Sequence, residues 1–245
     1  MSIDKKITFI SHKTYNNKDE SFMPKAGKTQ VPKWFSSSDK YFKDPVKEDV
    51  VQHEWGAKVL NFKSCPALLD LFLDSYYLTT PCDIIFYKDP TSGLQMAKTE
   101  KGYEDFIGYR DPMEGFVHPH GYEAHHFHWY PNWGVKLEKG YSAIFMSPMN
   151  RYDLPFISTA GIIDSDVLDI PGLVPFFLRS NFSGIIPAGT PYVQVFPFKR
   201  ESWKMETVYP DQEEIIERHN KSGNFLRTTD GGQYKKHLWN RKSYE

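Results

Sequence analysis

The sequence predicts a mainly β protein with one packed helix, an extended N-terminal arm and a C-terminal tail. Phe, Trp and Tyr make up 16% of the 245 residues, a content that favours a β-rich fold over a helical bundle. Over residues 192–198 the side chains alternate between two faces, with Val193, Val195 and Pro197 on one of them. This is strand spacing. A chain of this length can also bury a substantial core.

The first third of the chain contains the predicted arm and the predicted helix. Residues 1–45 are polar, lysine-rich and interrupted by proline, which predicts an extended arm. The alternation over residues 50–62 predicts a strand. Ser64 stands two residues before Pro66, as an N-cap and a first-turn proline do, and apolar residues follow at helical intervals. We therefore expect a helix over about residues 65–77.

The rest of the chain is predicted to consist of strands and turns, followed by a short helix. Residues 82–87 have strand character, residues 88–124 are loop-rich, and residues 133–194 alternate between apolar segments and turns of proline and glycine. Residues 209–245 are expected to form a short helix that ends at Gly223, followed by a basic aromatic tail. Residues 46–208 would then form a single β-rich domain.

Charge and hydropathy argue against several classes of partner. The formal net charge of -1 gives no electrostatic footprint for nucleic acid, so we expect no nucleic-acid partner. No apolar run approaches membrane-spanning length, and the charged N-terminus lacks a signal-like apolar core, so we expect no membrane partner. Cys65 and Cys82 lack a metal-binding spacing, and we expect reduced thiols in a soluble, cytoplasmic protein, with a disulfide as the alternative.

Residues 161–200 resemble the third sequence motif and following strand of the dUTPase and dCTP-deaminase superfamily. The segment starts with an apolar pair and an acidic turn and ends with a glycine turn before a glutamine-bearing strand. The matching residues are Ile162, Ile163, Asp164, Asp166, Gly189 and Gln194. Upstream, LEKGYSAIFMSP at 137–148 is similar to the preceding strand. The resemblance implies a dUTPase-like (β-clip) barrel, and barrels of that superfamily commonly form trimers.

The same resemblance supplies candidate site residues. It implies that Asp164 orients an attacking water, which makes it the catalytic candidate, and that Arg151, Asp166 and Gln194 contact a ligand. The chain departs from the pattern at Val167, where the superfamily has a sugar-stacking tyrosine, and it lacks the phosphate-contacting serine–glycine motif. In the alternative interpretation, the two aspartates cap a turn and accept hydrogen bonds from its backbone amides.

Five of the nine histidines fall in the sequence HPHGYEAHHFH at 118–128. Alternating histidines on a strand point to the same face, and imidazole is a good ligand for zinc or iron. The candidate metal ligands are His118, His120, Glu123, His126 and His128. IPAGTPY at 186–192 is similar to a cupin motif, although Tyr192 stands where that family has a metal-binding histidine. In the alternative interpretation the histidines pack in an irregular aromatic loop, and the protein has no cofactor.

Over its full length the chain resembles a family of uncharacterised tailed-phage proteins, which includes cyanophage members. The segments that carry this resemblance are VPKWF at 31–35, KSCPALLDLF at 63–72, LEKGYSAIFMSP at 137–148, GIIDSD at 161–166 and IIPAGTPYVQVFPFKRESW at 185–203. The resemblance implies a viral setting, with the protein in the host cytoplasm during infection or in the virion.

Three functions follow from these observations. The leading hypothesis is a phage-encoded, non-enzymatic, oligomeric structural or accessory protein. Its partners would be other copies of the chain, with a trimer suggested by the barrel resemblance, and other virion proteins. The alternatives are a nucleotide hydrolase or deaminase relative with an altered site, and a cupin-like histidine-metal enzyme.

Overall fold

The computed structural model describes residues 5–12, 22–112, 114–226 and 234–240. Strands account for 32% of the residues and helices for 18%, which confirms the mainly β class. No helix in the described part of the chain is both long enough and apolar enough to cross a membrane.

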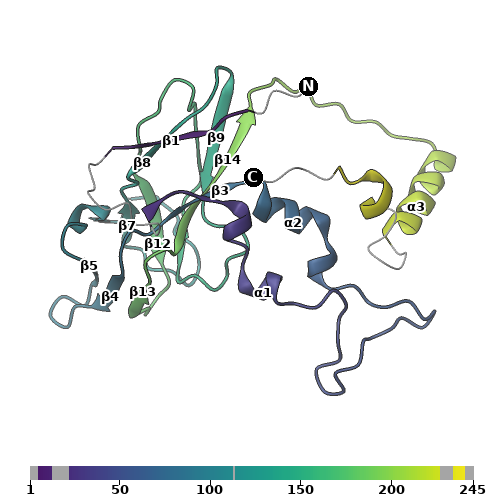
Figure 1. The fold of residues 1–245 in the computed structure, drawn as a ribbon, viewed down its shortest axis with the longest axis horizontal. Coiled ribbons are helices and arrows are strands. Elements are labelled where there is room, and N and C mark those ends of the chain that lie inside the picture. Colours follow the sequence, from purple (N-terminus) through teal and green to yellow (C-terminus); the bar gives the residue numbers. More distant parts are fainter. Residues whose placement is uncertain (1–4, 13–21, 113, 227–233, 241–245) are drawn as a thin grey trace. The chain divides into compact units, whose positions relative to one another are not determined.

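The chain divides into two compact units, whose elements are drawn in Figure 1. Unit 1 comprises Met1–Gln30 and Ser75–Arg200, and unit 2 comprises Val31–Asp74 and Glu201–Glu245. These boundaries differ from the expected single domain over 46–208. The reason is that the helical segment around Phe72 packs on aromatic residues of the expected arm.

The largest sheet of unit 1 has five antiparallel strands. In spatial order they are β11 (Gly161–Ile163), β9 (Tyr141–Met146), β14 (Pro191–Lys199), β3 (Tyr76–Thr79) and β2 (Lys25–Ala26). β14 confirms the strand predicted from the alternation over 192–198. It pairs with β9 along one edge and with β3 along the other, and the two long strands β9 and β14 run side by side in Figure 1.

A four-stranded antiparallel sheet contains part of the histidine segment. Its strands, in spatial order, are β10 (Phe156–Ser158), β12 (Val174–Leu178), β7 (His126–Trp129) and β6 (Ile107–Arg110). The central strand β7 pairs Phe127 with Phe176 on one side and with Tyr109 on the other.

Two smaller sheets complete unit 1. One joins β1 (Thr8–Ser11) to β8 (Trp133–Lys136), and the other has the order β13 (Gly184–Ile186), β4 (Ile84–Lys88), β5 (Gln95–Thr99). Short 3-10 helices lie at η2 (Gly27–Thr29) and η4 (Glu104–Phe106). The described strands thus form separate sheets, and none of these sheets closes on itself. The expected barrel is corrected in this respect, because closure requires the last strand of a sheet to pair with the first.

Strands of all four sheets contribute side chains to one hydrophobic core. At its centre the Trp129 indole stacks on Phe176, with ring centroids 3.8 Å apart, and Phe106 and Tyr192 lie against the same indole. The Trp129 Nε1 donates to Ser158 Oγ at 3.0 Å, and Ser158 Oγ donates to the Tyr192 carbonyl oxygen at 2.8 Å. The polar atoms that this core buries therefore have partners, as buried polar groups require.

The first segment of unit 2 contains α1 (Lys33–Ser36), the 3-10 helix η3 (Phe62–Ser64) and α2 (Pro66–Leu73). Phe72 of α2 is fully buried and packs against Phe35 and Trp34 of α1, at centroid distances of 5.0 and 6.0 Å. Isolated bridges join Tyr41 to Leu60, Lys43 to Val50 and Gln52 to Lys58. The strand predicted over 50–62 is therefore not formed, and this range contains only isolated bridges.

The second segment of unit 2 contains α3 (Gln212–Leu226) and the π-helix η5 (Tyr234–Leu238). Helix α3 confirms the predicted helix but continues past Gly223, because a glycine within a helix weakens it without necessarily ending it. After η5, the Trp239 Nε1 donates to Asp70 Oδ2 at 3.0 Å, so part of the expected tail binds to α2. Residues 241–245 of that tail lie outside the described residues.

Two further predictions are corrected in their details. The expected arm over 1–45 contains β1 and β2, because two short segments of it pair with β8 and β3, while residues 1–4 and 13–21 lie outside the described residues. The helix expected over about 65–77 ends at Leu73, and Tyr76 already begins β3. The aromatic and β-branched residues after Asp74 favour pairing with β14 over another helical turn.

Candidate functional site

The two candidate aspartates lie in the turn that follows β11, and both contact Arg200 at the end of β14. Asp164 Oδ1 accepts a hydrogen bond from Ser142 Oγ at 2.6 Å and lies 3.1 Å from an Arg200 nitrogen. Asp166 accepts hydrogen bonds from both terminal nitrogens of Arg200 and, at 2.7 Å, from the backbone amide of Gly140. The arginine thus links two neighbouring turns to the end of a central strand.

The electrostatics of this network favour the ionised form of Asp166. Hydrogen bonds from Arg200 and from the Gly140 amide lower the pKa of Asp166 from 3.8 to about 2. The same hydrogen bond from Arg200 to Asp166 raises the pKa of the guanidinium. The Asp166 side chain is only 5% exposed and stays a carboxylate at neutral pH. It fits the alternative interpretation of a turn-stabilising residue, although the amide that it caps belongs to the neighbouring turn.

The other two predicted ligand-binding residues also make contacts within unit 1. The guanidinium of Arg151 binds the carboxylate of Asp153, with contacts of 2.8 and 2.9 Å, and these hydrogen bonds lower the pKa of Asp153. Gln194 of β14 is fully buried, and its Oε1 accepts from the Met149 amide while its Nε2 donates to Ser75 Oγ, both at 2.8 Å. Each of these side chains connects strands or turns of the fold.

The histidine segment splits into an exposed part and a buried part. His118 and His120 are exposed and lie outside regular secondary structure. Glu123 contacts the protein instead, because its Oε1 accepts from the Asn181 amide at 3.1 Å. His126 lies on β7 and is 1% exposed, with its ring 5.2 Å from that of Phe177.

The two histidines of β7, His126 and His128, favour the neutral form of the imidazole. Burial and the nearby Arg110 lower the pKa of both His126 and His128, and the Ala124 carbonyl opposes this effect at His126. Both ring nitrogens of His126 and the Nδ1 of His128 lack a hydrogen-bond partner of good geometry among the described residues. In the same part of the chain, no group of three or more His, Cys, Asp or Glu side chains is placed to hold a metal ion. A metal site of this kind needs at least three protein ligands, so the zinc or iron site at these residues stays a prediction.

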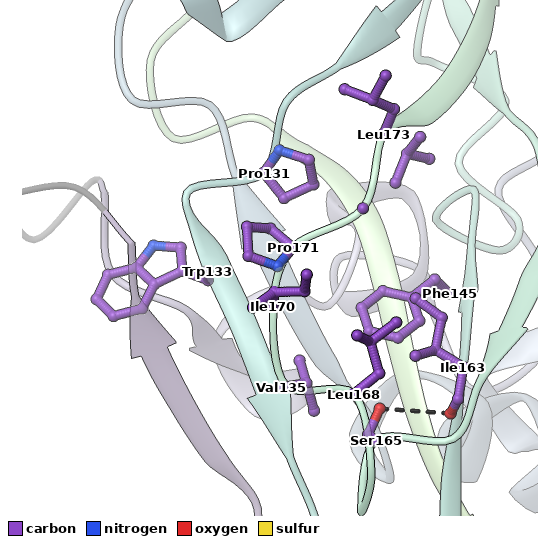
Figure 2. A pocket seen from close by; sticks show the side chains of 12 residues that line it. Pro131, Trp133, Val135, Phe145, Ile163, Ser165, Leu168, Ile170, Pro171 and Leu173 are labelled. Atoms are coloured by element: carbon purple, nitrogen blue, oxygen red, sulfur yellow. Dashed lines mark hydrogen bonds between the residues drawn. The ribbon is translucent and has the colours of Figure 1, made fainter.

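An apolar cleft in unit 1 lies beside the acidic turn, and it was not among the features predicted from the sequence. Its space of about 350 Å³ includes open solvent, and it is lined by side chains of β8, β9, β11 and β12 and by the loop over 164–173. Figure 2 shows Pro131, Ile170 and Pro171 along one side of this space and Phe145, Ile163 and Leu168 along another. Ser165 is polar, but its Oγ donates to the Ile163 carbonyl oxygen at 3.4 Å, the contact dashed in Figure 2.

The loop over 164–173 is held on β8 by several contacts. The Leu137 amide donates to the Ser165 carbonyl oxygen at 3.0 Å, and Lys136 forms an ion pair with Asp169 at 3.2 Å. Gly134 permits the close approach of the Asp169 backbone, because a Cβ at this position would lie 1.7 Å from the carbonyl oxygen. These contacts fix the loop against β8, so the loop is an integral part of the fold.

Several apolar side chains at the cleft are exposed to solvent. Leu168, Ile170 and Leu173 line the cleft and are about half exposed, and Val167, which precedes Leu168 in the same loop, is 82% exposed. We call the cleft together with these four side chains the cleft face. The signal that could have revealed it is the number of large aliphatic residues in DVLDIPGL, since turn segments are usually polar.

A second cleft, of about 500 Å³, lies elsewhere in unit 1. Residues that line it include Tyr76, Leu137, Tyr141 and Pro197, and the ion pair between Lys5 and Glu138 borders it. The two charged atoms are 2.6 Å apart, and both side chains are exposed to solvent. Such an ion pair contributes little to stability, and the cleft contains none of the predicted site residues.

Comparison with protein-family models and with the curated proteins gives no match. The fold brings Asp164 and Asp166 together around Arg200. It places Arg151 and Gln194 in separate contacts and separates the exposed histidines from His126. These polar side chains are bonded within the fold, whereas the apolar side chains of the cleft face are exposed to solvent.

Proposed function

We propose that this chain is a non-enzymatic protein that acts by associating with other copies of itself. In the setting that its phage resemblance implies, it would be an oligomeric structural or accessory protein. The single observation that carries the proposal is the cleft face, where apolar side chains surround an apolar cleft. Contiguous exposed apolar patches typically mark sites of protein interaction.

The contacts of the predicted catalytic groups support a role without chemistry. Asp166 and Arg200 neutralise each other, and Asp164 accepts a hydrogen bond from Ser142. Gln194 is fully buried and bonded at both ends of its amide. A hydrolase needs groups that are free to orient water and to stabilise developing charge. Here those groups stabilise turns.

The experiment is sedimentation velocity of the full chain over a series of concentrations, with two matched double variants. Val167→Asp with Ile170→Asp places two carboxylates on the cleft face, one at the cleft itself and one in the exposed loop beside it. Val46→Asp with Val117→Asp adds the same charge at two exposed valines outside the cleft face, each 88% exposed. We expect the wild type and the control to associate and the cleft-face variant to sediment as a monomer, because a buried unpaired charge is costly at an interface.

Several results would contradict the proposal. A wild type that remains monomeric at every concentration would overturn it. Equal dissociation of the cleft-face variant and the control would remove the assignment of the interface to the cleft face. Turnover of dUTP or dCTP, or a rise of the melting temperature in their presence that Asp164→Asn abolishes, would establish the nucleotide-enzyme alternative in its place.

A further inference from the structure

The segment after β14 has the sequence pattern of a strand. Residues 201–209 read ESWKMETVY. Trp203, Met205 and Tyr209 share one side of the alternation with Thr207, and Lys204 and Glu206 share the other side with Val208. Side chains two residues apart point to the same side of an extended chain. The pattern therefore gives one large apolar side and one mainly polar side, as in a half-buried strand.

In the structure, residues 201–209 do not belong to a sheet. Residues 201–210 form neither helix nor strand. Trp203 is 88% exposed, and Met205 and Tyr209 are each 90% exposed. Val208 in the same segment is also exposed. Four large apolar side chains exposed within nine residues are unusual for a surface segment, because burying such side chains stabilises a structure. From here on we call residues 201–209 the arm; this segment is distinct from the N-terminal arm that the sequence predicts over 1–45.

Unit 1 carries a surface that matches such an arm. β11 is the terminal strand of the five-stranded sheet, and edge strands can accept an added strand through their outer backbone groups. Ile163 of β11 and Leu168 line the apolar cleft, and the exposed Val167 precedes Leu168 in the same loop. A strand added beside β11 would place alternate side chains on the cleft face.

We infer that the arm of one copy of the chain adds as a strand beside β11 of a second copy and buries Trp203 and Met205 against its cleft face. The inference rests on the proposed function, and it names the segment and the surface that join the copies. Each copy offers one arm and one cleft face, so reciprocal exchange buries both on both partners. Such an exchange closes a symmetric assembly, whether a dimer or a larger ring.

The chemistry of the cleft favours this occupant over a small molecule. Its space of about 350 Å³ includes open solvent, so the enclosed part is smaller than a typical ligand pocket. Ligand pockets also carry a few polar groups that orient the ligand, whereas the polar Ser165 bonds to Ile163 within the cleft. An apolar cleft of this size suits one or two large side chains, and the arm carries them.

The first test compares two arm variants by sedimentation velocity of the full chain. Trp203→Ser with Met205→Ser removes the apolar side, and Lys204→Ser with Glu206→Ser changes the polar side of the same stretch. We expect the first to weaken self-association by at least about tenfold, because buried Trp anchors dominate interfaces. The second should stay within about twofold of the wild type. Since the arm is exposed, both variants should keep the near-UV circular dichroism of the wild type.

The second test is complementation between two defective chains. The Trp203→Ser/Met205→Ser chain retains its cleft face, and the Val167→Asp/Ile170→Asp chain retains its arm. Each should be monomeric alone, and their mixture should form a heterodimer through one intact joint. Hydrogen exchange should show protected amides over 202–209 in this heterodimer and in the wild-type assembly, because an added strand bonds through its backbone.

The outcomes separate the two proposals. A wild type that associates, with an arm variant that associates equally well, overturns the arm inference and leaves the proposed function standing. A monomeric wild type overturns both, including the case in which the arm is protected within a single chain. A mixture that stays monomeric, or an assembly with unprotected arm amides, also rejects the exchange of strands.

Discussion

His126 is the residue whose environment departs most from what its chemistry prefers. It is 1% exposed, and neither ring nitrogen has a hydrogen-bond partner of good geometry among the described residues. Burial, Arg110 and His125 all lower its pKa below 6.5. The folded protein therefore holds this ring in its neutral form, at the cost of unsatisfied polar atoms.

This environment predicts a histidine-dependent loss of stability in acid. Because the pKa is lower in the folded chain, the unfolded chain takes up the proton as the pH falls below about 6.5, and stability is lost there. One group can contribute at most about 1.4 kcal/mol per pH unit. We expect His126→Phe to reduce the loss in free energy of unfolding between about pH 7.5 and about pH 5.5, measured by urea denaturation.

The control for this prediction is His120→Phe, since His120 is exposed. It should retain the wild-type pH dependence. If His126→Phe and the wild type lose the same free energy over this interval, then His126 does not carry the effect.

Because the pKa of Asp166 is lowered, we expect a second loss of stability, at a more acidic pH than the loss caused by His126. Its pKa is lowered from 3.8 to about 2 by Arg200 and the Gly140 amide, so the stability that it contributes is complete above about pH 3.8 and is lost as the pH falls toward about 2. Asp166→Asn should lower the melting temperature at neutral pH and flatten its pH dependence in this interval. Asp169→Asn removes a carboxylate with an exposed ion pair and should leave the dependence intact. An unchanged pH profile in Asp166→Asn would contradict the network described above.

At the scale of elements, the loop over 164–173 depends on its close approach to β8. A Cβ at Gly134 would lie 1.7 Å from the Asp169 carbonyl oxygen, a backbone atom that cannot rotate away. We expect Gly134→Ala to destabilise unit 1 by about 1–3 kcal/mol and to weaken self-association, because the cleft face moves with the loop. Urea denaturation and sedimentation velocity would measure the two effects.

Gly172→Ala is the matched control in the same cleft. Nothing lies within 4 Å of a Cβ at that position, so the change should stay within about 0.5 kcal/mol. Equal effects of the two substitutions would mean that the loop does not require a glycine at β8.

The elements that the sequence predicts well are those with a complete local pattern. β14 alternates over most of its length, and α2 begins at Pro66, where the first-turn proline predicts a start. The predicted end of α2 is wrong because pairing of Tyr76 with Val195 of β14 decides it. Residues 50–62 alternate as well as a strand does, but the structure gives them only isolated bridges, since a strand also needs a partner.

At the scale of the whole molecule, association would link stability to concentration. An assembly that forms only from folded chains draws the folding equilibrium toward the folded state as the protein concentration rises. We therefore expect the melting temperature of the wild type to increase with concentration in calorimetry. The Val167→Asp/Ile170→Asp variant should show a constant value, and a wild-type melting temperature that is equally constant would argue against the oligomer.

In the candidate site, too, some features depend on residues close together in the sequence and others on residues far apart. The acidic turn that contains Asp164 and Asp166 could be predicted from the sequence, but their partners Ser142 and Gly140 could not. Arg200, their common partner, is more than thirty residues away and joins them because β14 and β11 both flank β9. The cleft face was missed for a similar reason, since β8, β9, β11 and β12 meet there only after folding.

Residues that are close together in the sequence were enough to predict the mainly β class, the strand at 191–199, the start of α2 and the acidic turn after Ile163. Each of these depends on residues that are neighbours along the chain. The tertiary structure alone decided that the sheets stay open, that Gln194 and Asp166 serve the fold, and that an apolar cleft lies beside the terminal strand of a sheet. These features depend on contacts between residues far apart in the sequence, and the free energy of such contacts becomes available only when the sheets assemble around a common core.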